Sequence, residues 1–300
     1  MKLKAMIPKD RALLGVMFGK TRVGKSGVCG TLGKPTMYLH TPQEGHGASI
    51  AAKVASECYP EAGVYPVNLG IAEEGDLDLG LIKDKKELGR VLSNDEIWVK
   101  LLLYINECPK DIGAIVVDSI TDLCNIISET REFEKNCTKK DGIYNKFKER
   151  ASFETMFHTL IDCLNTQRDK GKDCICTVAA SYTYNVEGQP VGLKPEVAMF
   201  GIADTILKCF PDVFPVDRVV VPTEDGGERE VIAFVMNMRV GKTQYKKDEK
   251  TKKDVKKDEI YATGRITSYE ISLPLGLEVG LLKADFAKIK ETLLLLQEQE

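Results

Sequence analysis

Short apolar segments alternate with longer segments of helical spacing between residues 12 and 181. The apolar segments are Ala12–Phe18, Pro35–Thr41, Gly63–Leu69, Ile112–Asp118 and Cys174–Ser181. Most of them are continuously apolar, without polar–apolar alternation, which is typical of strands buried on both faces of a parallel sheet. We therefore expect five central strands.

Helical spacing of apolar residues fills the intervals between these strands. The segment that starts at Asn94 begins with a capping residue and places Ile97, Leu101 and Ile105 on one face. The predicted helices are Lys25–Leu32, Gly47–Cys58, Asn94–Cys108, Asp122–Phe133 and Arg150–Gln167, with loops over 71–93 and 135–144. A strand–helix unit repeated four times predicts an α/β fold, in which helices flank a mainly parallel sheet.

The alternation of predicted strands and helices ends after Thr183. Asp217–Pro222 and Glu230–Met238 indicate paired strands around a turn at Glu224–Gly227. The remaining predictions are a charged loop, a β segment and a closing helix, at Lys242–Glu259, Ile260–Leu273 and Lys283–Gln297. We expect a core over residues 1–245 and a β-rich extension over 246–300 that packs on it.

Charge and cysteine content narrow the class of protein. The 300 residues carry a formal net charge of −3, so any nucleic-acid contact needs a local basic patch. No apolar run reaches the roughly 18 residues that span a bilayer, and the N-terminus lacks a signal-peptide pattern, which predicts a cytoplasmic protein without a membrane partner. The nine cysteines are expected to be reduced thiols. Cys174 and Cys176 would share one strand face as small apolar residues, the alternative being a zinc site.

One motif carries chemistry. Residues Gly19–Ser26 match the phosphate-binding pattern G-x-x-x-x-G-K-[ST], between a predicted strand and a predicted helix. Gly19 and Gly24 let backbone N–H groups face an anion, Lys25 would reach the terminal phosphates, and Ser26 would bind Mg²⁺. The expected nucleotide-binding residues are Gly19, Lys20, Thr21, Arg22, Val23, Gly24, Lys25, Ser26 and Gly27.

A second motif supplies a metal-binding carboxylate. The apolar run from Ala114 ends in Asp118, which places this residue at the carboxyl edge of the sheet, where such folds bind ligands. We expect Asp118 to hold Mg²⁺ together with Ser26. Ser119 follows, where AAA+ proteins carry a glutamate.

The phosphate-binding motif, the segment that ends in Asp118 and the residues from Tyr38 to Gly45 together resemble RecA-like ATPases. More narrowly, they resemble phage-encoded AAA-domain ATPases and RecA-like single-strand annealing proteins. The resemblance covers about residues 10–245, although only the two nucleotide motifs are specific. It implies ATP as the nucleotide, a homo-oligomer, and the host cytoplasm if a phage encodes the chain. It also implies that Glu44 polarises the attacking water, the alternative being a solvated loop residue.

Two further roles come from the same resemblance. Ser181 occupies the position of a γ-phosphate sensor, where relatives commonly have Gln or His. Arg239, helped by Lys242, matches a segment that supplies a cation to the neighbouring subunit's nucleotide, although an ordinary basic strand end fits equally well.

Three functions fit the sequence. The first is an ATPase that acts on single-stranded DNA in recombination or replication, with Tyr182 and Tyr184 as stacking candidates and seven lysines between Lys246 and Lys257 as phosphate contacts. Packing tyrosines and a solvated loop are the simpler interpretations. The second is a nucleotide kinase, which the scarcity of lid arginines disfavours. The third is an assembly protein that ATP switches, with slow hydrolysis.

Overall fold

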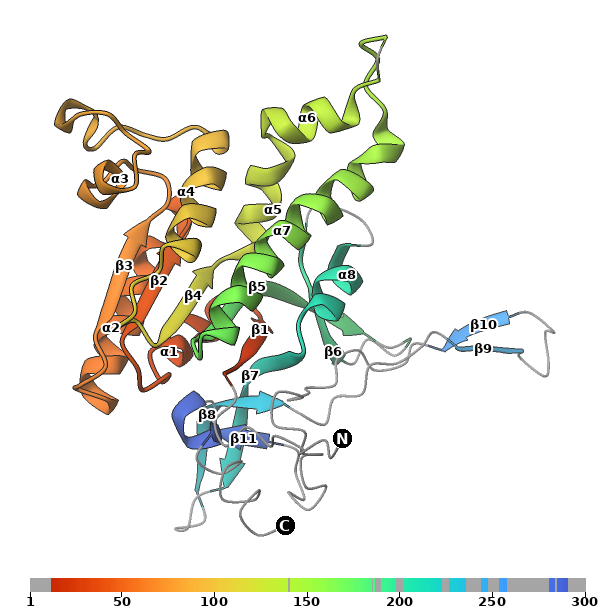
Figure 1. The fold of residues 1–300 in the computed structure, drawn as a ribbon. Helices are drawn as coiled ribbons and strands as arrows, with labels where there is room; N and C mark the ends of the chain where they lie inside the picture. Colours follow the sequence, from red (N-terminus) through yellow and green to blue (C-terminus); the bar gives the residue numbers. More distant parts are fainter. Residues whose placement is uncertain are drawn as a thin grey trace, which may run out of the picture.

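A computed structural model describes residues 12–139, 141–184, 186, 190–197, 202–222, 227–235, 244–247, 254–257, 281–283 and 285–290. Its centre is a nine-stranded sheet with helices on both faces (Figure 1). The strand order is β11-β8-β7-β1-β5-β4-β2-β3, and β6 pairs separately with β5. The strands are β1 (Leu14–Gly19), β2 (Thr36–His40), β3 (Val64–Asn68), β4 (Ala114–Asp118), β5 (Asp173–Tyr184), β6 (Pro190–Pro195), β7 (Asp212–Pro222), β8 (Glu228–Val235) and β11 (Leu281–Lys283).

The central strands are parallel, which confirms the predicted fold class. Strand β5 lies between β1 and β4, so the strand that precedes the phosphate-binding motif and the strand that ends in Asp118 are not neighbours. Their carboxyl ends nevertheless open on the same edge, because all three strands run in one direction. Strand β3 forms one edge, and Pro66 within it lacks the N–H that another strand would need.

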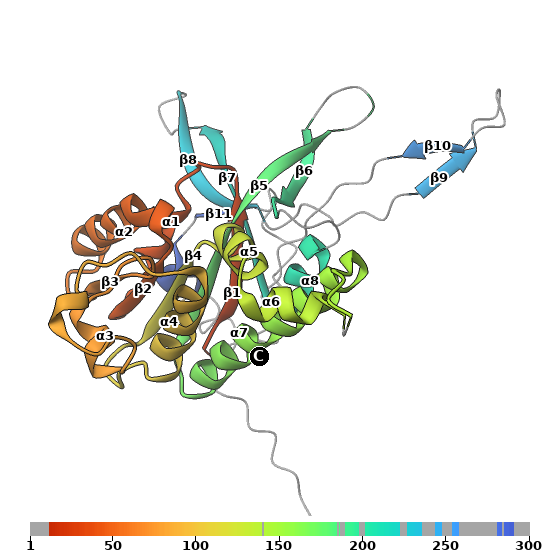
Figure 2. The ribbon, with the colours of Figure 1, turned by 90° about the horizontal axis from the view of Figure 1, so that it is seen from above.

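Two helical layers cover the sheet, as the view from above shows (Figure 2). One face packs against α4–α8 and the other against α1, α2 and residues 286–290. Strand β1 and the residue before it contribute to both layers by alternation. Leu14, Val16 and Phe18 belong to the first core, and Leu13 and Met17 to the second. The helices are α1 (Lys25–Cys29), α2 (Gly45–Cys58), α3 (Glu74–Asp78), α4 (Asn94–Asn106), α5 (Ile120–Ser128), α6 (Arg131–Cys137), α7 (Glu149–Asp169) and α8 (Ile202–Cys209), with 3-10 turns η1 (Pro42–Glu44), η2 (Lys85–Glu87) and η3 (Lys146–Lys148).

Several helix boundaries differ from the prediction because side-chain caps set them. The cap of α4 is Ser93, whose hydroxyl accepts from the backbone N–H of Glu96, and Asn94 is the first helical residue. The single helix predicted over Asp122–Phe133 is two helices, since Ser119 caps α5 and Thr130 caps α6. Helix α1 is shorter than predicted and ends at Cys29.

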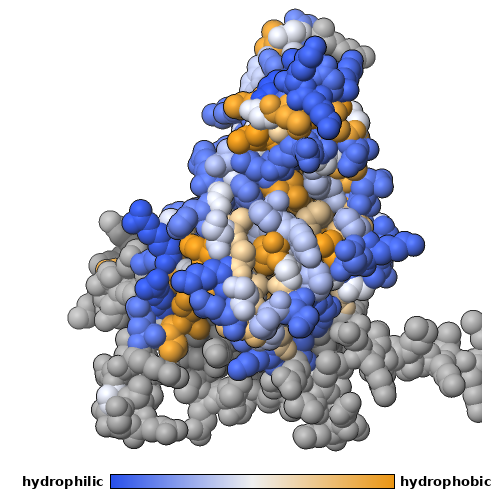
Figure 3. All heavy atoms as spheres, turned by 90° about the vertical axis from the view of Figure 1, so that its left-hand side faces the viewer, coloured by the Kyte–Doolittle hydropathy of each residue, from blue (hydrophilic) through white to orange (hydrophobic). Residues whose placement is uncertain are grey.

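The excursion over 71–93, predicted as a loop, contains α3 and η2 around a buried ammonium. The Lys100 side chain is fully buried, and its Nζ donates to the carbonyls of Asn68 (2.9 Å) and Ile71 (2.8 Å). It also forms an ion pair with the buried carboxylate of Asp76 at 2.8 Å. These contacts fasten the excursion to α4. Seen from the β3 side, small apolar areas lie among mostly hydrophilic residues (Figure 3).

The second half of the chain extends the sheet in a way that the sequence shows only in part. Strand β7 starts at Asp212, five residues before the predicted start; it pairs in parallel with β1 and then in antiparallel with β8. The predicted pairing of the strands at Asp217–Pro222 and Glu230–Met238 is therefore confirmed, and β8 ends at Val235. The charged segment predicted as a loop contains an antiparallel pair, β9 (Gln244–Lys247) and β10 (Asp254–Lys257), whose register sets Asp254 opposite Lys247.

Residues 285–290 pack on the face of the sheet that α1 and α2 cover. Phe286 packs against Phe214 and Phe234, with ring centroids 5.1 and 5.2 Å apart. The Lys290 ammonium lies 3.0 Å from the buried carboxylate of Asp173, which also contacts Lys34 at 2.9 Å. The helix predicted from Lys283 begins at residue 286, because β11 takes Leu281–Lys283. The segment Ile260–Leu273 lies outside the described residues, and the domain boundary at 245 stays a prediction.

Two further sequence predictions concern the cysteine thiols and membrane-spanning segments. All nine cysteines lie among the described residues and are free thiols. Cys174 and Cys176 are buried in the core beneath α7, as small apolar residues would be. In the part of the chain that the structure describes, no helix combines the length and apolar character that crossing a bilayer needs.

Candidate functional site

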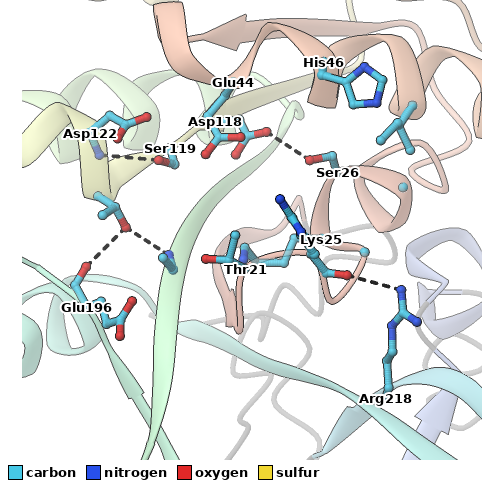
Figure 4. A pocket seen from close by; sticks show the side chains of 16 residues that line it. Thr21, Lys25, Ser26, Glu44, His46, Asp118, Ser119, Asp122, Glu196 and Arg218 are labelled. Carbon is cyan, nitrogen blue, oxygen red and sulfur yellow. Dashed lines mark hydrogen bonds between the residues drawn. The ribbon is translucent and has the colours of Figure 1, made fainter.

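The phosphate-binding motif forms a tight loop between β1 and α1 (Figure 4). Gly24 has a φ of 109°, a backbone conformation that favours glycine, and the end of the Ile232 side chain occupies the space where a Cβ would lie, 2.5 Å from its Cδ1. Arg22 has a φ of 66°, the left-handed region. The Val23 side chain is buried in the second core and anchors the loop.

Lys25 points back over the loop that precedes it. Its Nζ donates to the carbonyls of Gly19 (2.8 Å) and Lys20 (3.0 Å). Burial lowers the pKa of this ammonium, while Asp118 and Glu44 oppose the shift by favouring the charge. A lysine at the first residue of a helix, directly after a glycine-rich loop, suits a phosphate anion.

Asp118 is buried and receives hydrogen bonds from three separate elements. Ser26 of α1 contacts Oδ2 at 3.2 Å, Tyr38 of β2 donates to the same oxygen, and Thr177 of β5 donates to Oδ1. Burial first, and then the nearby Cys29 and Asp118, raise the pKa of the Tyr38 phenol far above its ordinary value, so it stays a donor. The carboxylate is thus held in one orientation.

Gly47 of α2 closes the space around this carboxylate. A Cβ at position 47 would lie 2.7 Å from the Ser26 hydroxyl and 2.9 Å from Oδ2 of Asp118. Glycine therefore lets the backbone of α2 approach two oxygen atoms closely, those of a hydroxyl and a carboxylate. Such hard oxygens fit Mg²⁺, which takes one or two protein ligands and completes its shell with phosphates and water. The residues present fit a magnesium ion bound with a nucleotide.

Glu44 stands across the pocket from Lys25, at the end of η1. Its pKa is raised, first by burial and then by the charges of Asp118 and Asp122, while Lys25 opposes the shift. The turn that carries Glu44 is fixed by Thr41, whose hydroxyl donates to Asp122 at 2.7 Å and whose N–H donates to the carbonyl of Asp118 at 2.8 Å. Glu44 is therefore tied to the strand end that carries Asp118.

These groups share one pocket of about 720 Å³, within the usual range for small-molecule sites. Of the predicted residues, it is lined by Thr21, Arg22, Gly24, Lys25, Ser26, Gly27, Glu44 and Asp118. Gly19 and Lys20 contribute carbonyls that hold Lys25, whereas Val23 faces the core. Ser181 does not line this pocket. Arg239, Lys242 and the side chains of Tyr182 and Tyr184 lie outside the described residues.

The pocket also contains residues that the sequence did not indicate: His46, Ser119, Thr121, Asp122, Glu196 and Arg218. Thr121 links β5 to the residue that follows β6, since its hydroxyl accepts from the N–H of Ala179 (2.9 Å) and donates to the carbonyl of Glu196 (3.2 Å). Ser119 follows Asp118 through a cis peptide bond and caps α5, so the cap motif Ser-x-x-Asp was a usable signal for this edge. Glu196 and Arg218 come from distant segments and had no such signal.

Comparisons with known proteins add a fold-level likeness. No protein-family description matches the sequence, and neither does any curated protein. Among solved structures, the chain is similar to a crystal structure of the RadB recombinase, with 14% sequence identity, 75% of this chain and 88% of that chain covered, and a TM-score of 0.36. At that level the likeness carries no functional argument. The assignment to an α/β fold rests on the mainly parallel sheet with helices on both faces and on the position of the phosphate-binding loop between β1 and α1.

Proposed function

We propose that this protein binds and hydrolyses ATP with Mg²⁺. The observation that supports the proposal best is the meeting of Lys25, Ser26, Asp118 and Glu44 around one pocket, although they come from three separate segments of the chain. Each of them has the chemistry that one part of the reaction requires. The choice of ATP over other nucleotides rests on the motif resemblance.

Each residue has one task in the proposed reaction. Loop N–H groups and the Lys25 ammonium bind the phosphates and stabilise the charge that develops during transfer. Ser26 and Asp118 hold the metal, which when bound neutralises phosphate charge. Glu44 orients a water molecule in line with the terminal phosphate and accepts its proton. The products are ADP and phosphate.

We further propose that the partner is single-stranded DNA and that the protein acts as a homo-oligomer in recombination or replication. This part rests on the resemblance to RecA-like ATPases of the segments around Lys25, Glu44 and Asp118. Within it, Arg239 assists hydrolysis at the neighbouring subunit's nucleotide, with help from Lys242.

The first experiment measures phosphate release from Mg-ATP with and without single-stranded DNA, for wild type and Lys25→Ala. Hydrolysis that DNA stimulates and that the variant loses supports both parts of the proposal. Slow hydrolysis that Lys25→Ala abolishes but DNA does not affect would reject the DNA partner and favour an assembly protein that ATP switches. Equal release by both proteins would reject the nucleotide site.

A mixing experiment tests the shared site. Arg239→Ala and Lys25→Ala subunits are each combined with wild type and with one another. If the arginine acts in trans, mixtures of the two variants deviate from the activity expected from dilution alone. Activity that follows simple dilution at every ratio would contradict the role of Arg239.

A further inference from the structure

Arg218, in the middle of β7, contacts the phosphate-binding loop from the side opposite α1 (Figure 4). Its Nη2 donates to the carbonyl of Arg22 at 3.2 Å, and its Nη1 lies 3.1 Å from Oε2 of Glu230 on β8. Arg218 also lines the pocket. The guanidinium thus joins a strand pair to the loop, with its two nitrogens used in a fork.

The Arg22 carbonyl belongs to a turn that leads directly to Lys25. The peptide that offers this carbonyl to Arg218 directs its other end, the N–H of Val23, to the carbonyl of Lys20 at 3.2 Å. The same Lys20 carbonyl accepts from Nζ of Lys25. A continuous series of contacts therefore runs from β7 through the turn to the ammonium that faces the phosphates.

The strand pair touches the loop at a second point. Ile232 of β8 occupies the space beside Gly24 that a Cβ would need. The loop residues Arg22 and Gly24, both at positive φ, are thus each supported from β7 or β8. Such conformations persist where surrounding structure holds them in place.

Stability alone does not explain the ion pair. The side chains of Arg218 and Glu230 are 49% and 57% exposed, and ion pairs this exposed contribute little to the free energy of unfolding. Their position against the loop is what distinguishes them. We propose that Arg218 is a positioning residue for nucleotide binding: held by Glu230, it fixes the turn at Arg22 so that the loop is preorganised for the phosphates.

This inference rests on the proposed nucleotide site, and binding measurements separate the two. Affinities for Mg-ATP and Mg-ADP are measured for wild type, Lys25→Ala, Arg218→Ala, Arg218→Lys and Glu230→Gln. The matched control is Arg90→Ala, which removes another half-exposed arginine paired with glutamates, away from the pocket. Hydrogen exchange of the Val23 amide reports directly on the turn.

Arg218→Ala is expected to lower the affinity for both nucleotides by about tenfold, because a preorganised loop binds the phosphates that they share. Arg218→Lys should recover little of the lost affinity, since a single ammonium nitrogen does not replace two guanidinium nitrogens with separate partners. The amide of Val23 should exchange faster in Arg218→Ala, and Arg90→Ala should match wild type in every measurement. Glu230→Gln keeps a hydrogen-bond acceptor for Arg218, and its affinity for both nucleotides should fall by about threefold.

Other outcomes overturn the inference in distinct ways. If Arg218→Ala binds like Arg90→Ala, while Lys25→Ala has lost binding, the positioning role is wrong and the nucleotide site stands. Weaker ATP binding with unchanged ADP binding would make Arg218 a contact of the terminal phosphate and not a support of the loop. Equal nucleotide binding by wild type and Lys25→Ala would reject both the site and this inference.

Discussion

Tyr38 donates its phenolic proton to the same oxygen of Asp118 that the Ser26 hydroxyl contacts. The two donors come from β2 and α1, so the orientation of the carboxylate depends on the packing of the sheet against a helix. The predicted metal ligand is therefore held in place by a buried phenol of the central sheet. This relationship leads to the first prediction.

Tyr38→Phe should weaken Mg²⁺ binding, because groups that orient a metal ligand typically contribute about tenfold or more to affinity. The measurement is the Mg²⁺ concentration that gives half-maximal phosphate release. Tyr59→Phe is a matched control, since the Tyr59 hydroxyl donates to Asp285 at 2.8 Å, away from the pocket. Both variants should lose about 1 kcal/mol of unfolding free energy. The same Mg²⁺ dependence in both would contradict a positioning role for Tyr38.

Gly47→Ala should damage the metal site while leaving the fold intact. Alanine raises helix propensity by about 1 kcal/mol, but its methyl group would press on Ser26 and Asp118 at 2.7 and 2.9 Å. The expected result is a loss of Mg-ATP affinity of about tenfold or more with a melting temperature that does not fall. Gly45→Ala is the control, since its Cβ would meet only His40, at 3.5 Å. Equal affinities in the two variants would show that the metal site does not need a glycine beside Asp118.

Hydrolysis should depend on pH through Glu44. Burial first, and then Asp118 and Asp122, raise its pKa above the ordinary 4.5, and only the ionised form accepts a proton. The rate should therefore rise with pH as this carboxyl ionises. In Glu44→Gln this acid limb should disappear and the rate should fall by about 100-fold or more. Glu57→Gln, at an exposed residue of α2, the helix that follows Glu44, should keep the wild-type profile.

The raised pKa of Glu44 also makes the free energy of unfolding depend on pH. Because the folded protein binds this proton more tightly than the unfolded chain, the free energy of unfolding contributed by Glu44 is present below pH 4.5 and is lost as pH rises through the folded-state pKa. Urea unfolding of wild type and Glu44→Gln across this interval measures the difference. A difference that does not vary with pH would mean that the pKa of Glu44 is not raised.

Asp173→Asn should destabilise the whole sheet. The buried carboxylate accepts from the N–H of Leu13 at 2.8 Å and pairs with Lys290 and Lys34. Removing its charge leaves Lys290, whose side chain is 9% exposed, without that compensation, which typically costs about 3 kcal/mol or more. Urea unfolding of Asp173→Asn provides the test. Asp169→Asn, at an exposed ion pair with Arg168, should change stability by less than about 1 kcal/mol, and equal losses would contradict the prediction.

How far the sequence predicts this site depends on how local each part is. The phosphate-binding loop and Asp118 are visible because each lies in one short stretch, and a strand–turn–helix unit places such stretches by itself. The predicted strands that form the centre of the sheet are confirmed for the same reason: their apolar runs are local. Their order in the sheet is not local, since β5 inserts between β1 and β4 although it follows both.

The residues that the sequence did not indicate are those placed by this order. Neither Tyr38 nor Thr177 stands out within its strand until β2, β4 and β5 lie side by side around Asp118. Arg218 meets Arg22 only because β7 pairs with β1 over residues 212–215. Helix boundaries at Ser119 and Thr130 were missed for a different reason: capping hydroxyls compete with apolar spacing, and they decide where a helix begins.

The contact between residues 285–290 and the sheet also bears on how the protein is made. A ribosome delivers β1 long before Phe214, Phe234 and Phe286, the aromatic residues that complete the second core. Until they emerge, the nascent chain exposes apolar strand faces of the kind that chaperones protect from aggregation. Nucleotide binding at the proposed site is therefore expected only after Phe286 has been synthesised, since the second core behind the strand that precedes the loop is incomplete without it.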